Sequence, residues 1–204
     1  MILINDSPLF ANSSVVTPIQ QADPYEKFPL NGKASIKDGG KDGAHSAALR
    51  SRIAANVSEI YEILTDYKNF SQYMPHTKSC KVVKEKDAVK WVEYTLVFLV
   101  FIEVRYTLKI LHELKPDKKN ARIVWNLSEG EQFKEIRGYW MLEELPVEKN
   151  SGQPWTGVSY VSQLVPKVSI PRAIFDHLTK KSVYELFDAV RQRVEDQKSQ
   201  EKTK

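Results

Sequence analysis

Apolar residues recur at helical spacing along the last part of the chain, from about Ser169 to Asp196. They follow the i, i+3, i+4, i+7 pattern of a single helix face. Ser169 suits the N-cap position, and Pro171 suits the first turn. A long helix with such a stripe is stable only when other elements cover it. The stripe consists of Ile174, Leu178, Val183, Leu186, Phe187, Val190 and Val194.

Before this helix, from about Ser79 to Leu164, the pattern changes to a period of two, which is typical of strands with one buried face. We expect Lys90 to Phe98 and Ile102 to Leu114 to be the two longest strands. Further strands are expected around Trp125, Trp140 and Tyr160. Their alternation favours an antiparallel sheet with one face covered.

Upstream of these strands, Ala47 to Ile53 also alternates and predicts a first strand. Asn56 followed by Glu59 is a capping-box pattern and predicts a helix that continues to about Tyr67. A second short helix is expected over residues 69–74, before Pro75. The order of elements predicts an α+β fold: a curved antiparallel β-sheet wrapped around a long C-terminal α-helix, with two short helices after the first strand.

Three regions follow from these patterns. Residues 1–32 contain several prolines without periodicity, and we expect a loosely ordered extension that contacts the domain through Tyr25 and Phe28. Residues 33–196 form the folded domain, and residues 197–204 are expected to be a disordered polar tail. The glycine-rich stretch 38–43 matches neither a calcium loop nor a phosphate loop, so we interpret it as a turn.

Composition narrows the class of protein. The chain has 204 residues, of which 42% are hydrophobic, enough for a sizeable core. Its net charge of +4 is spread out, so no nucleic-acid partner is expected. The single cysteine, Cys80, excludes an internal disulfide framework and a thiolate metal cluster. We expect a soluble protein, with the cytoplasm favoured and a periplasmic or secreted location left open if translation starts upstream. The oligomeric state stays open.

The order of elements and several local motifs resemble the START-like superfamily, also called SRPBCC, which includes polyketide cyclases, lipid-transport domains and a quinone-binding branch. The matching stretches are Tyr61 to Pro75, Val104 to Leu108, Gly138 to Leu142 and the terminal helix. The resemblance implies a helix-grip fold with a deep apolar cavity between sheet and helix. It also implies small hydrophobic ligands, such as lipids, sterols, quinones or polyketides.

No catalytic motif, metal-ligand set or cofactor-binding motif is recognisable, and the four histidines are scattered over different elements. We therefore predict no catalytic residues, no metal and no cofactor. On the inward faces of the expected elements, the side chains predicted to line the cavity are Tyr94, Leu96, Tyr106, Leu108, Ile110, His112, Trp125, Trp140, Tyr160, Ser162, Leu178 and Leu186. Buried hydroxyl or imidazole groups there must bond to protein, water or ligand.

An unbroken apolar run, Leu96 to Ile102, crosses the point where the two long strands must reverse. Hairpin turns normally carry Gly, Asn or Asp. Leu99, Val100 and Phe101 are therefore predicted to form the cavity mouth, where they gate the ligand or touch a membrane transiently. The alternative is that this tip is self-packed or covered by the N-terminal extension or a partner.

Three functions stay open on the sequence. The leading hypothesis is a non-catalytic domain that binds a small hydrophobic ligand. Transfer of that ligand is an extension of this hypothesis. The first alternative is a cyclase-type enzyme on an aromatic or polyketide substrate, with His112 and a tyrosine as acid–base groups. The second is a protein interaction module like that of the ribosome-associated branch.

Overall fold

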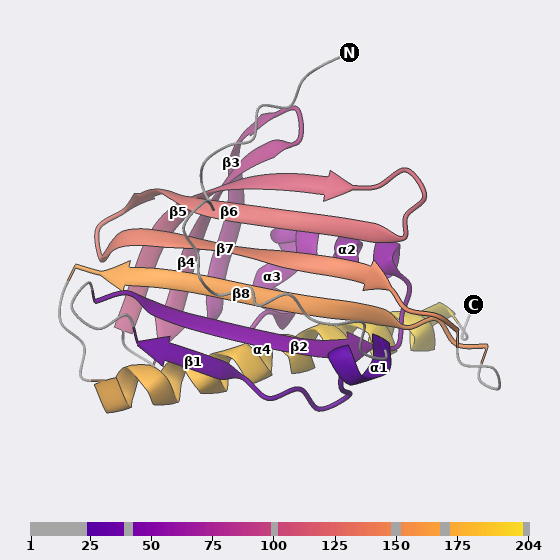
Figure 1. Cartoon of the computed structure of the whole chain (residues 1–204). Coiled ribbons are helices and arrows are strands. Elements are labelled where there is room, and N and C mark those ends of the chain that lie inside the picture. Colours follow the sequence, from indigo (N-terminus) through magenta and orange to yellow (C-terminus); the bar gives the residue numbers. More distant parts are fainter. Residues whose placement is uncertain (1–23, 39–42, 99–101, 148–151, 168–171, 202–204) are drawn as a thin grey trace, which may run out of the picture.

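The computed structural model describes residues 24–38, 43–98, 102–147, 152–167 and 172–201, except the side chains of residues 24, 172–178 and 201 (Figure 1). Its helices and strands, in chain order, are α1 (Pro24–Lys27), β1 (Ser35–Asp38), β2 (His45–Ile53), α2 (Val57–Thr65), η3 (Tyr67–Asn69), α3 (Phe70–Tyr73), β3 (Thr77–Lys86), β4 (Val89–Phe98), β5 (Ile102–Leu114), β6 (Asn120–Gly130), β7 (Phe133–Glu144), β8 (Thr156–Pro166) and α4 (Arg172–Glu201).

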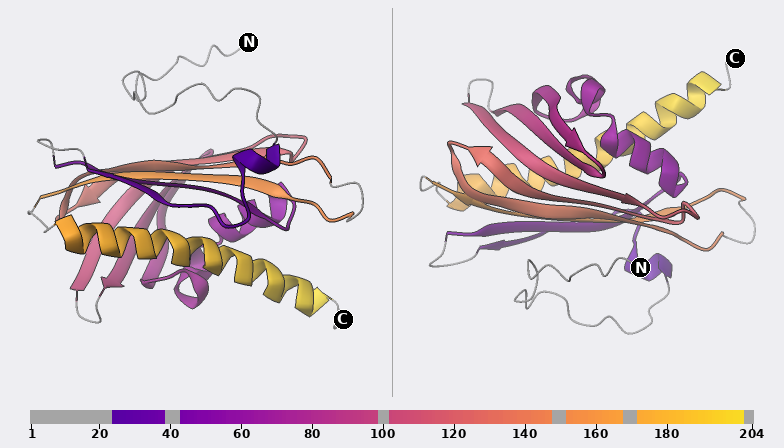
Figure 2. Two further views of the ribbon diagram at one scale, coloured as in Figure 1. Left: turned by 60° about the horizontal axis from the view of Figure 1, so that its bottom comes forward. Right: turned by 90° about the horizontal axis from the view of Figure 1, so that it is seen from above.

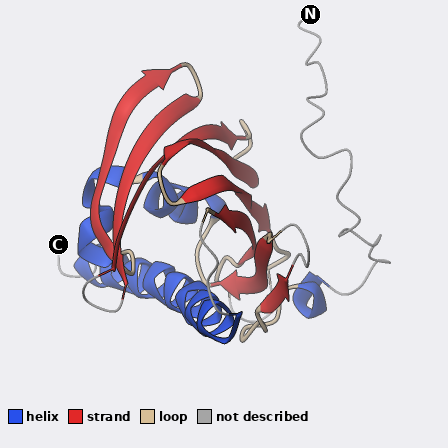
Figure 3. Ribbon diagram, turned by 90° about the vertical axis from the view of Figure 1, so that its left-hand side faces the viewer, coloured by secondary structure: helices blue, strands red, loops and turns tan. Residues whose placement is uncertain are grey.

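The strands form one antiparallel, eight-stranded sheet in the order β1-β2-β8-β7-β6-β5-β4-β3. The sheet curves, and α2, α3 and α4 all lie on its concave side (Figure 3). Helix α4 runs along this side, while the short α1 lies on the opposite face (Figure 2). This arrangement confirms the predicted helix-grip fold.

The buried stripe of α4 explains why the sheet holds it. Val183, Phe187, Val190 and Val194 are each at most 4% exposed, and Leu186 is partly buried beside them. Each large side chain of this kind stabilises the fold by about 1.5–3 kcal/mol when it is covered. The N-terminal end of the predicted stripe, Ile174 and Leu178, and the predicted cap, Ser169, lie outside the described side chains.

Helix α2 begins where the capping box predicts. The Glu59 backbone N–H donates to the Asn56 Oδ1 over 2.9 Å, and the Asn56 backbone N–H donates to the Glu59 Oε2 over 2.7 Å. Two helix N-terminal donors are thereby satisfied. Ile60, Ile63 and Leu64 are buried on its inner face, so the helix covers one end of the concave side.

Two expectations about element lengths differ from the structure. β5 is the longest strand, but β4, with 10 residues, is shorter than β6, β7 and β8. Helix α4 continues beyond Asp196 to Glu201, so the first part of the expected tail is helical. The Lys198 ammonium donates to the Ala54 carbonyl, and this contact ties the added turn to the domain.

The folded part also begins before residue 33. Phe28 is 1% exposed, and its ring covers Gly157 of β8, where an added Cβ would lie only 2.7 Å from the ring. Strand β1 pairs with only the first residues of β2, which leaves the edge of β2 from Leu49 onward without a strand partner. The segment after α1 covers this edge, and Gly32 lies so close to the Arg50 carbonyl that no side chain fits there.

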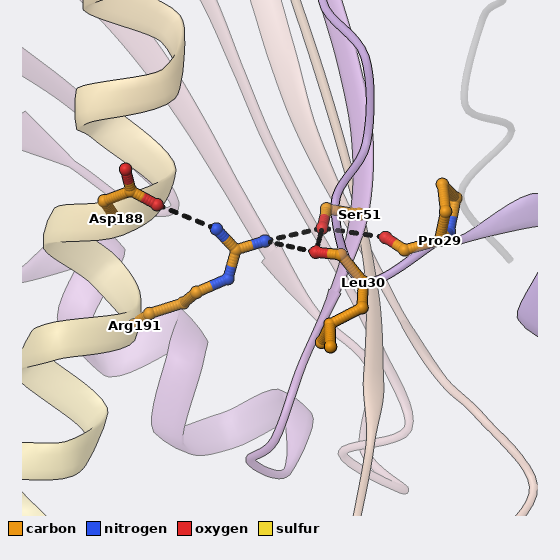
Figure 4. Close-up of polar contacts among 5 residues, drawn as sticks. All are labelled: Pro29, Leu30, Ser51, Asp188 and Arg191. Atoms are coloured by element: carbon orange, nitrogen blue, oxygen red, sulfur yellow. Dashed lines mark hydrogen bonds and ion pairs between the residues drawn. The ribbon is translucent and has the colours of Figure 1, made fainter.

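A polar contact ties this segment to α4 (Figure 4). The Arg191 Nη2 donates to the Ser51 Oγ over 2.6 Å and to the Leu30 carbonyl over 2.9 Å. Its Nη1 lies 2.9 Å from the Asp188 Oδ1. The Ser51 hydroxyl lies 3.0 Å from the Pro29 carbonyl and 2.9 Å from that of Leu30. One guanidinium therefore joins α4, β2 and the segment after α1.

Candidate functional site

A cavity of about 580 Å³ lies between the concave face of the sheet, the α2–α3 region and α4. Most of the residues predicted to line it do so: Tyr94, Leu96, Tyr106, Leu108, Ile110, Trp125, Trp140, Tyr160, Ser162 and Leu186. Strand alternation accounts for this agreement, because each of these residues on the sheet occupies an inward position of its strand.

The other predicted residues fall elsewhere. The side chain of Leu178 and the whole of Leu99, Val100 and Phe101 lie outside the described residues. His112 has the predicted inward orientation and is 9% exposed, but it does not line the cavity. It lies near the end of β5, where Tyr67 of η3 covers it.

His112 is part of a buried hydrogen-bonded chain. Its Nδ1 lies 3.2 Å from the Ala88 carbonyl, which can only accept, so Nδ1 carries the proton. Its Nε2 therefore accepts from the Tyr67 hydroxyl over 2.7 Å. Burial lowers the pKa of His112 and raises the pKa of Tyr67, which favours the neutral form of both groups. Tyr67 itself lines the cavity.

Two residues of one cavity wall, Tyr94 and Tyr106, belong to a row of residues in register across four strands. Cys80 on β3 is opposite Tyr94 on β4, Tyr94 is opposite Tyr106 on β5, and Tyr106 is opposite Gly130 on β6. The rings of Tyr94 and Tyr106 stack with centroids 5.5 Å apart, and Phe133 meets Tyr106 edge-on at 5.9 Å. These contacts fix the direction of the Tyr106 ring.

A second aromatic group forms the wall nearer α4. The ring of Tyr160 lies 4.6 Å from that of Trp140 and 5.8 Å from that of Trp125, and Phe187 contacts Trp140 at 5.4 Å. The Trp125 ring lies across Gly138, where an added Cβ would come within 2.5 Å of it. Glycine at this position therefore allows a large indole to form part of the wall.

The wall residues that sequence reasoning missed include a group from the helical region and its exit: Phe70, Met74, Pro75, His76 and Thr77. His76 has a positive φ of 60°, which is uncommon outside glycine. Its ring lies tilted against that of Phe98, with the centroids 4.8 Å apart, and its Nε2 lies 2.9 Å from the Glu185 Oε2 on α4. No local sequence signal places His76 beside Glu185, because this contact depends on how far the sheet curls toward the helix.

The cavity wall is apolar beside the end of the β4–β5 hairpin. Phe98 and Ile102, which flank the predicted mouth, both line the cavity, and Ile102 is 43% exposed. The same residue therefore faces both the interior and solvent.

The chemistry of the wall is neutral. The residues described as lining the cavity include no Asp, Glu, Lys or Arg. Burial raises the pKa of Tyr94, Tyr106 and Tyr160, so their phenols stay protonated near neutral pH. Within the described ranges, no group of His, Cys, Asp and Glu side chains could hold a metal ion. In that same part of the chain, no helix has the length and apolar character needed to cross a bilayer.

Residues 53–191 match the family model described as "Polyketide cyclase / dehydrase and lipid transport". The chain belongs to this family. Its architecture is that of the START-like domains that bind small hydrophobic ligands, in agreement with the resemblance seen in the sequence. No curated protein matches the sequence significantly.

Solved structures with the same fold are distant in sequence. A STAR-related lipid transfer protein from Xanthomonas axonopodis is 14% identical, with a TM-score of 0.64 over 79% of this chain and 92% of that one. A START superfamily protein from Mycobacterium smegmatis is 16% identical, with a TM-score of 0.59 over 74% and 97%. The Zhui aromatase/cyclase from Streptomyces sp. R1128 is 13% identical, with a TM-score of 0.58 over 74% and 94%. At these identities the likeness supports the fold alone.

Proposed function

We propose that this protein binds a small hydrophobic ligand, such as a lipid, sterol, quinone or polyketide-like molecule, between the sheet and α4. The observation that carries the proposal is the apolar cavity of about 580 Å³, within the size range of small-molecule sites. A ligand that buries about 300 Å² of apolar surface would gain about 7 kcal/mol before the cost of immobilisation. That gain is sufficient for stable binding without any charged contact.

The experiment that tests this proposal is native mass spectrometry of the protein purified from its own cells. We expect a fraction that carries a co-purified apolar molecule and loses it on extraction with organic solvent. The proposal is wrong if the native protein has only the apo mass and also binds no added apolar probe in a saturable way.

Transfer of the ligand is the extended part of the proposal. A carrier needs an opening that can meet a membrane, and the apolar flanks Phe98 and Ile102 support the predicted mouth at Leu99, Val100 and Phe101. We expect the protein to co-sediment transiently with anionic vesicles, and Leu99→Ser/Phe101→Ser to reduce this binding while thermal stability is retained. If wild type never binds vesicles and the double variant is destabilised, the tip is part of the core.

A second candidate function, a cyclase acting on an aromatic or polyketide substrate, is favoured by one observation. Tyr67 lines the cavity and donates its proton in a hydrogen bond to neutral His112, an arrangement that could relay a proton to or from a bound substrate. Here we expect turnover to fall at least about a hundredfold in both Tyr67→Phe and His112→Gln, with substrate affinity retained. Unchanged turnover in both variants would exclude a catalytic role for this pair.

A further inference from the structure

The wall of the cavity restricts the charge of its ligand, and this inference rests on the function proposed above. Because none of the lining residues that the structure describes is Asp, Glu, Lys or Arg, an ionised headgroup inside the cavity would have no full counter-charge. Two imidazoles line the cavity, those of His45 and His76, and the His76 imidazole already faces the carboxylate of Glu185. Burial of an uncompensated charge opposes binding strongly.

The wall also contains one phenol that differs from its neighbours. The Tyr67 hydroxyl bonds to His112, and the phenols of Tyr94 and Tyr160 have the polar side chains of Cys80 and Ser162 as neighbours. Within the described part of the chain, the Tyr106 hydroxyl has no hydrogen-bond partner. A hydroxyl in an apolar wall is stabilised by a partner, which a ligand in the cavity can supply.

The position of this hydroxyl is set by its surroundings. Tyr94 stacks on one face of the Tyr106 ring, with an angle of 25° between the planes, and Phe133 meets the ring at 84°. A donor fixed in this way loses little freedom when it bonds to a ligand.

We infer that the cavity selects uncharged ligands that carry a hydrogen-bond acceptor such as a ketone carbonyl, and that the Tyr106 hydroxyl donates the bond that sets this preference. Burial keeps the pKa of this phenol above its usual range, so it remains a donor over the whole neutral pH range. The chemical class is therefore a neutral, largely apolar molecule with a hydrogen-bond acceptor. Fatty acids and other ionised amphiphiles are disfavoured.

The test compares three probes of similar shape: 2-acetylanthracene, 2-ethylanthracene and anthracene-2-carboxylate. Binding is followed at pH 7 through the fluorescence of the protein, since Trp125 and Trp140 line the cavity. For wild type we expect saturable binding of both neutral probes, with the carboxylate at least about tenfold weaker than the ketone. Tyr106→Phe should weaken the ketone about fivefold and leave the ethyl compound unchanged.

Tyr139→Phe is the matched control, because Tyr139 has the opposite orientation on β7 and does not line the cavity. It should change the affinity of none of the probes. Equal binding of carboxylate and ketone, or equal effects of Tyr106→Phe on the ketone and the ethyl compound, would overturn the inference while the proposed function stands. Failure of all three probes to bind would overturn the inference, and it would overturn the proposed function as well if the native protein carries no co-purified ligand.

Discussion

Gly138 provides a sharp test of how the cavity wall is built. A Cβ at this position would lie 2.3 Å from the Val161 carbonyl oxygen and 2.5 Å and 2.7 Å from two atoms of the Trp125 ring. Real Cβ contacts essentially never fall below 3.0 Å, so either the indole or strand β8 must move. The carbonyl belongs to the strand ladder and cannot shift without loss of sheet geometry.

Two opposing effects determine the result of Gly138→Ala. Overpacking of this kind costs about 1–3 kcal/mol. Alanine also restricts the unfolded chain, which stabilises the fold by about 0.4–1 kcal/mol. The clash is larger, so we expect a net loss of about 1–2 kcal/mol in the free energy of unfolding. Displacement of the indole should also weaken the binding of an apolar probe in the cavity.

Gly130→Ala is the matched control, because its added Cβ would approach Leu127 Cδ1 and Tyr106 Cβ only to 3.2 Å. The Leu127 side chain can yield, and we expect a change within about 0.5 kcal/mol. Urea unfolding curves with a common slope give both values. If the two variants have equal stability, the placement of Trp125 across Gly138 is wrong.

Three further predictions concern polar groups that do not line the cavity. Arg191→Met should lower the free energy of unfolding, measured in urea, by about 1–2 kcal/mol, because Ser51 and the Leu30 carbonyl lose a charged donor. An unchanged free energy of unfolding would contradict the contact of Arg191 with these two groups. Burial lowers the pKa of His112, so the unfolded chain binds an extra proton below about pH 6.5. The free energy of unfolding should therefore fall as the pH is lowered, and it should fall less steeply in His112→Asn than in wild type. Burial raises the pKa of Cys80 to about 12. Alkylation of this thiol at pH 8 should therefore be about a thousandfold slower in the folded protein than in the urea-unfolded protein. Similar alkylation rates in the two states would contradict this burial.

The fold could be predicted because its signals are local. The capping box at Asn56 and Glu59, the alternation along β5 and the apolar stripe of α4 each depend on residues that are neighbours in the sequence. Segment ends were less predictable. The chain around Gly32 has no periodicity, and its place beside β2 depends on how short β1 is.

The cavity wall was predictable to the extent that strand alternation determines it. Alternation gives the face of a residue but not its depth along the strand, so it could not separate Tyr106, which faces the cavity, from His112, which lies beneath Tyr67. The contact between His76 and Glu185 was also beyond reach, because it joins residues 109 positions apart through the curvature of the sheet.

The central claim is that a ligand occupies the cavity between the sheet and α4, and equilibrium binding of the neutral fluorescent probe N-phenyl-1-naphthylamine tests it most directly. Val104→Trp fills the cavity from β5, whereas Met141→Trp adds the same indole on the opposite face of the sheet, where Met141 is 45% exposed. Circular dichroism and thermal melts establish that both variants are folded. We predict saturable one-to-one binding by wild type and Met141→Trp, and loss of binding in Val104→Trp. Wild-type affinity in a folded Val104→Trp, or no saturable binding by wild type, would contradict the account.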